Sequence, residues 1–232
     1  MGLLSELSEL FLPRRCAGCG RETVSLCTTC LQLLGGIPRA METRYATLPV
    51  VGVSEYNSRL SHMVVNFKDN GRRDILDPLA LGLARSIVAA LDLVGHSGGP
   101  VRVVPAPSSE QAKRRRGGSH TAVLARRAAA LSPDLSLVVA DVLVARRRHD
   151  QVGLGAHARA ENARQSQFLI PDYAAEIGRE MPTTLLVDDF STTGATLAES
   201  TRVLTSVQVR PTAAAVIGLG RGGTRFVSPF TV

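Results

Sequence analysis

The segment 185–196 constrains the fold of this 232-residue chain more than any other part of the sequence. Its sequence is LLVDDFSTTGAT: three apolar residues, two aspartates and a hydroxyl-rich loop with one glycine. The apolar run predicts a strand buried on both faces, which is typical of a parallel sheet covered by helices. Because ligands of open α/β sheets bind at the carboxyl ends of the strands, we expect a functional site at Asp188 and Asp189.

The loop after the aspartates has the composition of an anion site. A helix is expected to begin near its end, so backbone N–H groups and the helix dipole would converge on one phosphate. The residues of this loop are Ser191, Thr192, Thr193, Gly194, Ala195 and Thr196. The aspartates can accept hydrogen bonds from the vicinal hydroxyls of a ribose or help to position Mg²⁺. The pattern predicts a sugar phosphate, and the alternative is that these residues only cap the helix.

All four cysteines lie between positions 16 and 30, as two Cys-x-x-Cys pairs, Cys16 with Cys19 and Cys27 with Cys30. This spacing predicts a four-cysteine zinc site, with glycines at positions 18 and 20 allowing the tight turn. Disulfides are disfavoured in the reducing cytoplasm that we expect for this protein. Because four protein ligands leave no open position on zinc, the metal is expected to stabilise the fold rather than to catalyse.

The formal net charge of +7 suits polyanionic ligands, and it becomes about +5 once four thiolates and one zinc ion are counted. Basic clusters at 113–116, 126–127 and 146–148 fit phosphate or nucleic-acid binding, but solvated helix faces show similar runs. Aromatic residues make up 4% of the chain and tryptophan is absent, which argues against a base-stacking platform for single-stranded DNA.

The first eleven residues contain Glu6 and Glu9 and no basic leader, so we expect neither a signal peptide nor membrane insertion. Their leucines fall on one face of a short amphipathic helix, which we expect to pack on the body of the protein.

Residues 31–49 have the composition of a connector, which predicts an N-terminal zinc module at 1–45 and an α/β domain at 46–232. Strands are expected at 50–56, 101–104, 137–144, 168–170 and 213–217, and helices at 74–93 and 119–131. This alternation favours a mostly parallel sheet flanked by helices.

The segment 185–196 resembles the fingerprint of type I phosphoribosyltransferases. Three further features extend the resemblance: the motif Gln151-x-Gly153-Leu154-x4-Arg159-x2-Asn162, a Pro-x-Pro turn at residue 105 and the leading four-cysteine module. Together they make nearly the whole chain similar to the ComF family of competence-associated, phosphoribosyltransferase-like proteins. The resemblance implies a type I phosphoribosyltransferase fold with an N-terminal zinc module and a link to bacterial DNA uptake.

The resemblance also implies residue roles. Asp188 and Asp189 face the ribose and are the candidate catalytic residues, and the loop 191–196 binds the 5′-phosphate. The pyrophosphate group is held by Pro105, Ala106, Pro107 and Ser108, with Arg147 and Gln151 as candidates from a covering loop. The chain departs from the family at 116–120, where Arg-Gly-Gly-Ser-His replaces Arg-Gly followed by an aromatic residue and asparagine.

Two functions follow as hypotheses. In the first, the protein binds phosphoribosyl pyrophosphate with Mg²⁺ and transfers ribose 5-phosphate to a nitrogen acceptor, which no residue of the sequence identifies. In the second, it is a non-catalytic adaptor that binds single-stranded DNA or competence proteins through its zinc module and basic surface.

Overall fold

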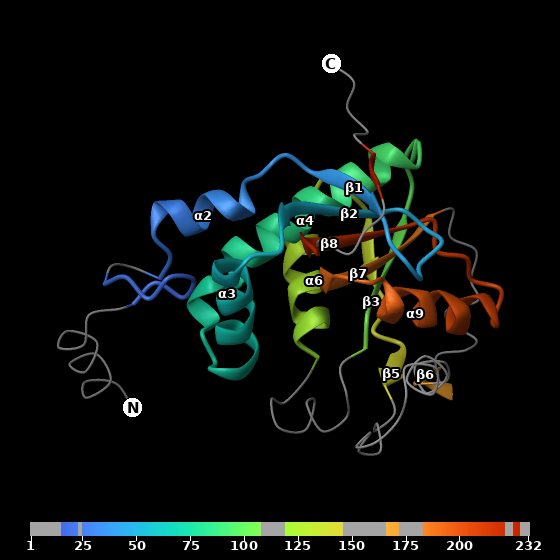
Figure 1. Ribbon diagram of the computed structural model, residues 1–232. Coiled ribbons are helices and arrows are strands. Elements are labelled where there is room, and N and C mark those ends of the chain that lie inside the picture. Colours follow the sequence, from blue (N-terminus) through green and yellow to red (C-terminus); the bar gives the residue numbers. More distant parts are fainter. Residues whose placement is uncertain are drawn as a thin grey trace.

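The computed structural model describes residues 15–22, 25–107, 119–145, 166–171, 183–220 and 225–227. Its centre is a seven-stranded sheet with the strand order β4–β3–β7–β8–β2–β1–β9 (Figure 1). These strands are β1 (Arg39–Glu42), β2 (Val50–Glu55), β3 (Val101–Pro105), β4 (Leu137–Val139), β7 (Thr183–Ser191), β8 (Ala213–Leu219) and β9 (Arg225–Val227). A separate antiparallel pair consists of β5 (Leu143–Ala145) and β6 (Gln167–Leu169).

The five strands from β4 to β2 are parallel to one another, while β1 runs antiparallel to β2 and to β9. The predicted mostly parallel sheet is therefore confirmed. Its centre is the pair β7 and β8, in which Leu186 lies opposite Ala214 and Asp188 opposite Val216. Every residue of β8 is buried, as expected for a strand covered on both faces.

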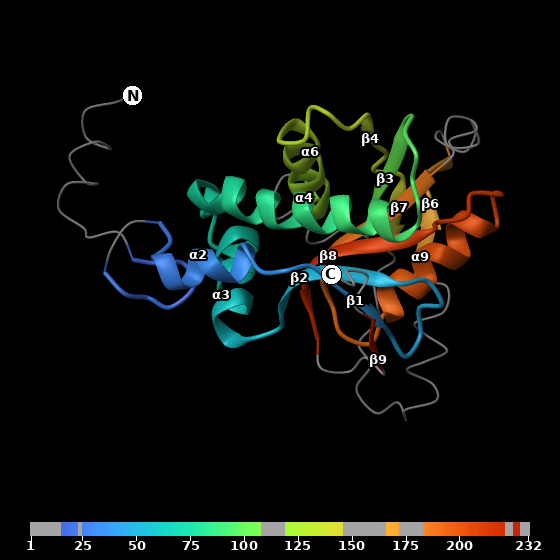
Figure 2. The same ribbon diagram turned by 90° about the horizontal axis from the view of Figure 1, so that it is seen from above.

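Helices cover both faces of the sheet (Figure 2). The helices are α2 (Thr28–Leu34), α3 (Ser58–Asp69), α4 (Leu76–Leu93), α6 (His120–Ala130) and α9 (Ala195–Thr205). Helix α4 packs on β8 and β2 through a stripe that includes Leu79, Leu83 and Ile87, which recur at helical spacing. Helix α9 covers the opposite face, where Leu197 and Leu204 join a second apolar cluster. The predicted α/β architecture with flanking helices is thus present.

Two predicted boundaries differ from the structure. Residues 39–42 were expected in a connector, but they form β1, because Ala40 and Met41 are buried against the sheet while Arg39 and Glu42 remain exposed. The strand expected at 137–144 is divided between β4 and β5. The chain leaves the main sheet after the Ala140 amide donates to Val103. The apolar run in the sequence therefore conceals a change of sheet.

No helix within the described ranges is long and apolar enough to cross a membrane. The amphipathic helix expected in the first eleven residues lies outside the described part of the chain.

Candidate ligand site and metal centre

The two aspartates lie near the carboxyl end of β7, which points toward α3 and α6 (Figure 1). Asp189 is only 6% exposed, and both of its carboxylate oxygens are engaged. Oδ2 forms an ion pair with Lys68 Nζ and accepts a hydrogen bond from His120 Nε2 at 3.1 Å, and Oδ1 accepts a hydrogen bond from the Phe190 amide at 2.7 Å. Asp189 is therefore fixed in place by a helix on either side.

Asp188 has a different environment. Its Oδ1 accepts a hydrogen bond from the Asp189 amide at 2.8 Å, and the residue retains partial exposure. Burial of the carboxyl group raises the pKa of Asp188 to about 6, against the opposing effect of the Lys68 charge. A carboxylate with a pKa close to neutrality is suited to accepting a proton. Of the two aspartates, Asp188 has the chemistry of a general base.

The predicted phosphate loop turns into α9 through Gly194. This residue has φ +76°, a conformation that glycine adopts without strain, and a Cβ atom there would collide with Thr43 Oγ1. The loop between β1 and β2 is hydrogen bonded to it, because the Tyr45 amide donates to the Thr193 carbonyl at 3.0 Å. Two separate segments thus fix the backbone that leads into α9.

Ser191 is the member of this loop whose environment points most directly to a ligand. Ser191 is only 3% exposed, and its Oγ has no hydrogen-bond partner among the described residues. A buried hydroxyl without a partner is costly unless something else binds it. Thr192, Thr193 and Thr196 are exposed around it. The hydroxyls and the first amides of α9 together fit a phosphate group.

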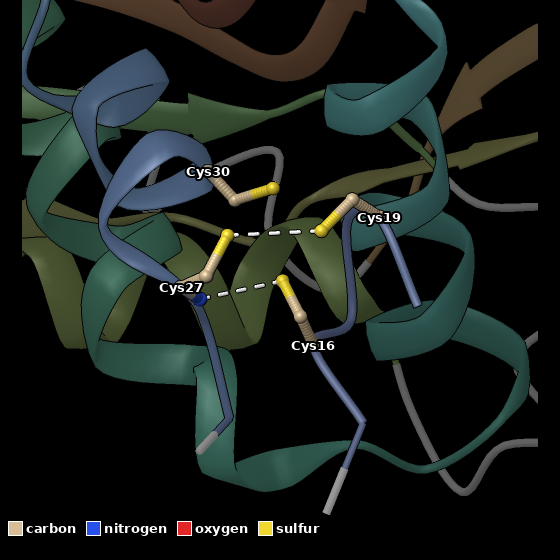
Figure 3. A group of neighbouring side chains, drawn as sticks. All are labelled: Cys16, Cys19, Cys27 and Cys30. Atoms are coloured by element: carbon tan, nitrogen blue, oxygen red, sulfur yellow. Dashed lines mark hydrogen bonds between the residues drawn. The ribbon is translucent and has the colours of Figure 1, made fainter. Parts of the chain in front are cut away.

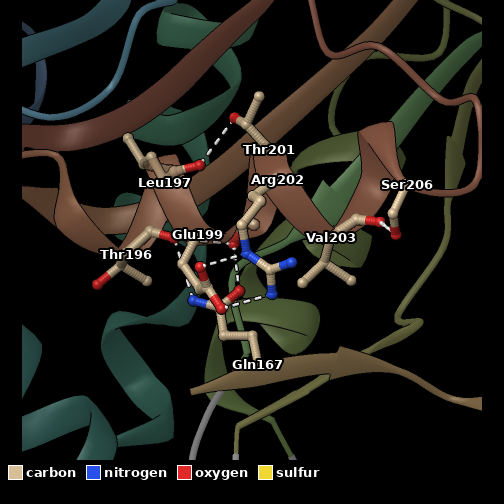
Figure 4. Close-up of polar contacts among 9 residues, drawn as sticks. Gln167, Thr196, Leu197, Glu199, Thr201, Arg202, Val203 and Ser206 are labelled. Carbon is tan, nitrogen blue, oxygen red and sulfur yellow. Dashed lines mark hydrogen bonds and ion pairs between the residues drawn. The ribbon is translucent and has the colours of Figure 1, made fainter. Parts of the chain in front are cut away.

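The first turn of α9 is supported from below by Gln167 of β6 (Figure 4). Gln167 is buried, its Nε2 donates to the Thr196 carbonyl at 3.0 Å, and its Oε1 accepts from Ser200 Oγ at 2.7 Å. One buried amide side chain therefore connects the small sheet to the end of the helix that faces the site. No motif in the sequence pointed to this role for Gln167.

The predicted pyrophosphate loop begins beside β7, because Pro105 pairs with Val187. Neither Pro105 nor Pro107 has a backbone N–H, and the Ala106 amide donates to the Val187 carbonyl at 2.7 Å. These three residues can therefore shape the loop, but no amide among them is free to hold an anion. The other expected members, Ser108, Arg147 and Gln151, lie outside the described residues.

The four cysteines meet at one point, with all four sulfur atoms within 4.8 Å of one another (Figure 3). Cys19 and Cys27 Sγ are 3.7 Å apart, close to the ~3.8 Å edge of a tetrahedron with zinc–sulfur bonds of about 2.3 Å. A Cβ atom at Gly18 would lie 2.7 Å from Cys30 Sγ, so only glycine allows this approach. The cluster fits a metal ion such as zinc.

The thiols differ in their readiness to ionise. Burial opposes ionisation of Cys16, but hydrogen bonds from the amides of Cys27, Cys19 and Gly18 lower its pKa to about 6. Burial raises the pKa of the Cys30 thiol. A bound cation would favour the thiolate form at every position, and metal binding is therefore accompanied by proton release.

Sequence reasoning missed Lys68 and His120. They lie 121 and 69 positions before Asp189, so no local spacing connects them to it. One signal was present: Lys68 is one of only two lysines in a chain with 27 basic residues. A chain that uses arginine almost everywhere retains a lysine at the ion pair with Asp189. His120 stands in the segment 116–120 that departs from the ComF pattern.

No protein-family model matches this chain, and no curated protein matches its sequence. The resemblance to the ComF family therefore rests on the motifs alone.

Proposed function

We propose that the protein binds phosphoribosyl pyrophosphate with Mg²⁺ at the carboxyl end of β7 and transfers ribose 5-phosphate to a nitrogen acceptor. The observation that carries this proposal is the buried Ser191 Oγ, which has no hydrogen-bond partner among the described residues and stands in the chain between the aspartate pair and the start of α9. A helix end and an unsatisfied hydroxyl suit the 5′-phosphate, and the carboxylates suit the ribose.

In the proposed reaction, the bond between the anomeric carbon and the pyrophosphate oxygen breaks, and the electron pair leaves with pyrophosphate. The acceptor nitrogen forms the new bond to the same carbon and loses its proton, which Asp188 accepts. Positive charge develops on the sugar during this exchange, so neighbouring carboxylates stabilise it. With Asp189 paired to Lys68 and His120, the Asp188 carboxylate is the group suited to both tasks.

Mg²⁺ is bound in proteins through one or two carboxylates together with substrate phosphates. Because a carboxylate bound to the ion would be a poor proton acceptor, the substrate phosphates and water would hold Mg²⁺ in this reaction, and Asp188 would remain the base. The ion would neutralise the leaving pyrophosphate. Four thiolates would occupy every coordination position of a tetrahedral zinc ion, so the cysteine cluster fits a structural metal site and not a catalytic one.

The link to DNA uptake and the adaptor function rest on the resemblance to the ComF family. The basic residues 114–116, which would contact single-stranded DNA, lie outside the described part of the chain, so no described contact favours the adaptor.

Isothermal titration of the zinc-loaded protein with phosphoribosyl pyrophosphate, with and without Mg²⁺, tests the proposal. We expect saturable binding that requires Mg²⁺, and at least a tenfold loss of affinity in Asp188→Asn, by about 1.4 kcal/mol or more. Asp134→Asn is the matched control, because it removes an exposed carboxylate elsewhere on the surface. A folded protein that gives no heat with this ligand contradicts the proposal.

A further inference from the structure

Helix α3 lies between the cysteine module, residues 15–34, and the aspartate site. One face of the helix is attached to the first cysteine pair. His62 Nδ1 lies 3.3 Å from the Gly18 carbonyl, and Asn66 Nδ2 donates to the Ala17 carbonyl at 2.8 Å. Between them on the helix, the fully buried Met63 packs against Gly18. The contacts fall one helical turn apart, so they fix the rotation of α3 about its axis.

The chain that follows α3 is attached to the same module. Arg72 donates to the carbonyls of Arg15 at 3.0 Å and Ser25 at 3.4 Å, and it forms a bidentate pair with Asp74 at 2.8 Å. The hydrogen bonds from Arg72 lower the pKa of Asp74 to about 2. The module therefore holds both the face of α3 and the segment after its carboxyl end.

Lys68 extends from the last turn of this helix to the ligand site. It follows Asn66 by two residues, which corresponds to about 200° around a helix, so the two side chains leave on nearly opposite sides. Asn66 contacts the module while Lys68 pairs with Asp189. A rotation or displacement of α3 at its module face must therefore move the Lys68 ammonium group away from or toward the carboxylate.

We infer that the cysteine module, when it holds its metal, positions Lys68 against Asp189, and that loss of the metal releases this ion pair. The metal centre then acts on the ligand site at a distance, through one helix. Within the described part of the chain, release of Lys68 leaves Asp189 with His120 as its side-chain partner and makes the site more negative. An anionic ligand should therefore bind more weakly to the protein without zinc, and this expectation rests on the proposed function.

The two lysines of the chain allow a direct test without any ligand. The full-length protein is exposed briefly to an amine-acylating reagent, and modification of Lys68 relative to Lys113 is measured by mass spectrometry. Lys68 is 21% exposed and ion-paired in the intact protein, so it should react slowly. Removal of the metal by a chelator should raise the Lys68/Lys113 ratio about tenfold, the effect of losing one close charge partner. Asp189→Asn gives the reference value for a Lys68 that has lost its ion pair with Asp189.

A second arm keeps the metal in place. The double variant His62→Ala/Asn66→Ala removes the two polar contacts between α3 and the module and should raise the ratio in the zinc-loaded protein. Val65→Ala, on the exposed side of the same helix, is the matched control and should leave it unchanged. This arm decides the matter if the metal-free protein unfolds, which circular dichroism would reveal.

An unchanged ratio in the double variant, with Asp189→Asn raising it as expected, would overturn the inference. Titration with phosphoribosyl pyrophosphate is a separate readout. If the zinc-loaded protein fails to bind that ligand while the labelling behaves as expected, the proposed function is wrong and the coupling between the module and Lys68 stands.

Discussion

Two neighbouring aspartates in this protein have different physical roles. Asp189 is buried, ion-paired with Lys68 and hydrogen bonded to His120, whereas Asp188 is held by one backbone amide and has a pKa raised to about 6. Burial disfavours the charged form of a carboxyl group, and a cation bound beside it removes this penalty. The two neighbouring carboxyl groups thus differ in their partners and in their tendency to ionise.

The raised pKa of Asp188 makes the stability of the ligand-free protein depend on pH. The folded chain binds this proton more tightly than the unfolded chain does, so the contribution of Asp188 to stability falls as the pH rises from about 4 to about 6. We expect Asp188→Asn to increase the free energy of unfolding at pH 7 by about 2 kcal/mol and to have little effect at pH 4. Urea titrations at the two pH values measure this difference. A variant less stable than the parent at pH 7 would contradict it.

Gly194 is expected to be far less tolerant of a side chain than another glycine with the same backbone conformation. Both Gly194 and Gly71 have positive φ, but a Cβ at Gly71 meets no atom within 4 Å, whereas one at Gly194 collides with Thr43. Gly71→Ala should cost about 1 kcal/mol through backbone strain alone, and Gly194→Ala more than about 2 kcal/mol. Thermal unfolding of the two variants compares them. Equal losses would show that the loop between β1 and β2 yields to the new methyl group.

At the scale of single elements, Gln167 fixes the end of α9 that faces the site. Gln167→Ala removes hydrogen bonds to the Thr196 carbonyl and the Ser200 hydroxyl and should cost about 2 kcal/mol. Hydrogen exchange should accelerate at residues 195–200. Ser206→Ala, which removes one bond to Val203 at the other end of the helix, is the control and should leave those amides unaffected. Equal exchange in both variants would contradict this role for Gln167.

The elements that the sequence predicted well are those whose signals are local. Strand β7 follows from a continuous apolar run, and the turn into α9 follows from a glycine among hydroxyl residues. Strand β1 was missed because only two of its four residues are buried, a pattern too short to show alternation. The division between β4 and β5 was missed because both pieces are apolar and only their pairing partners differ.

The candidate site, too, was predictable from the sequence only where its residues are close together in the chain. The aspartates, the phosphate loop and the cysteine spacing are each contained in a short segment. The partners of Asp189 come from two helices that precede it by many residues, and the pairing is set by how those helices pack. Periodicity and spacing carry no information about such contacts, which depend on tertiary structure.

At the scale of the whole molecule, the cysteine cluster that could bind zinc is part of the main core rather than an appendage. Cys16, Ala17, Leu26 and Leu34 belong to the same apolar cluster as α3 and α4. We expect one zinc ion per chain by elemental analysis, and its removal should lower the free energy of unfolding by at least about 3 kcal/mol. Calorimetry with and without a chelator measures the loss. An unchanged melting temperature in protein shown to be metal-free would contradict this structural role.

The strand order has a consequence for how the protein is made. β2 enters the sheet only through β8, which lies between it and β7, and β8 is synthesised about 160 residues after β2. Until Ala213–Leu219 has left the ribosome, β1 and β2 can pair with each other and β2 can pack on α4, but they cannot join the sheet beside β3, β4 and β7. The edge of β2 that later pairs with β8 therefore stays unpaired for most of the synthesis, and unpaired strand edges favour aggregation. Zinc binding to the four cysteines during synthesis would order the cysteine module before β8 has been made.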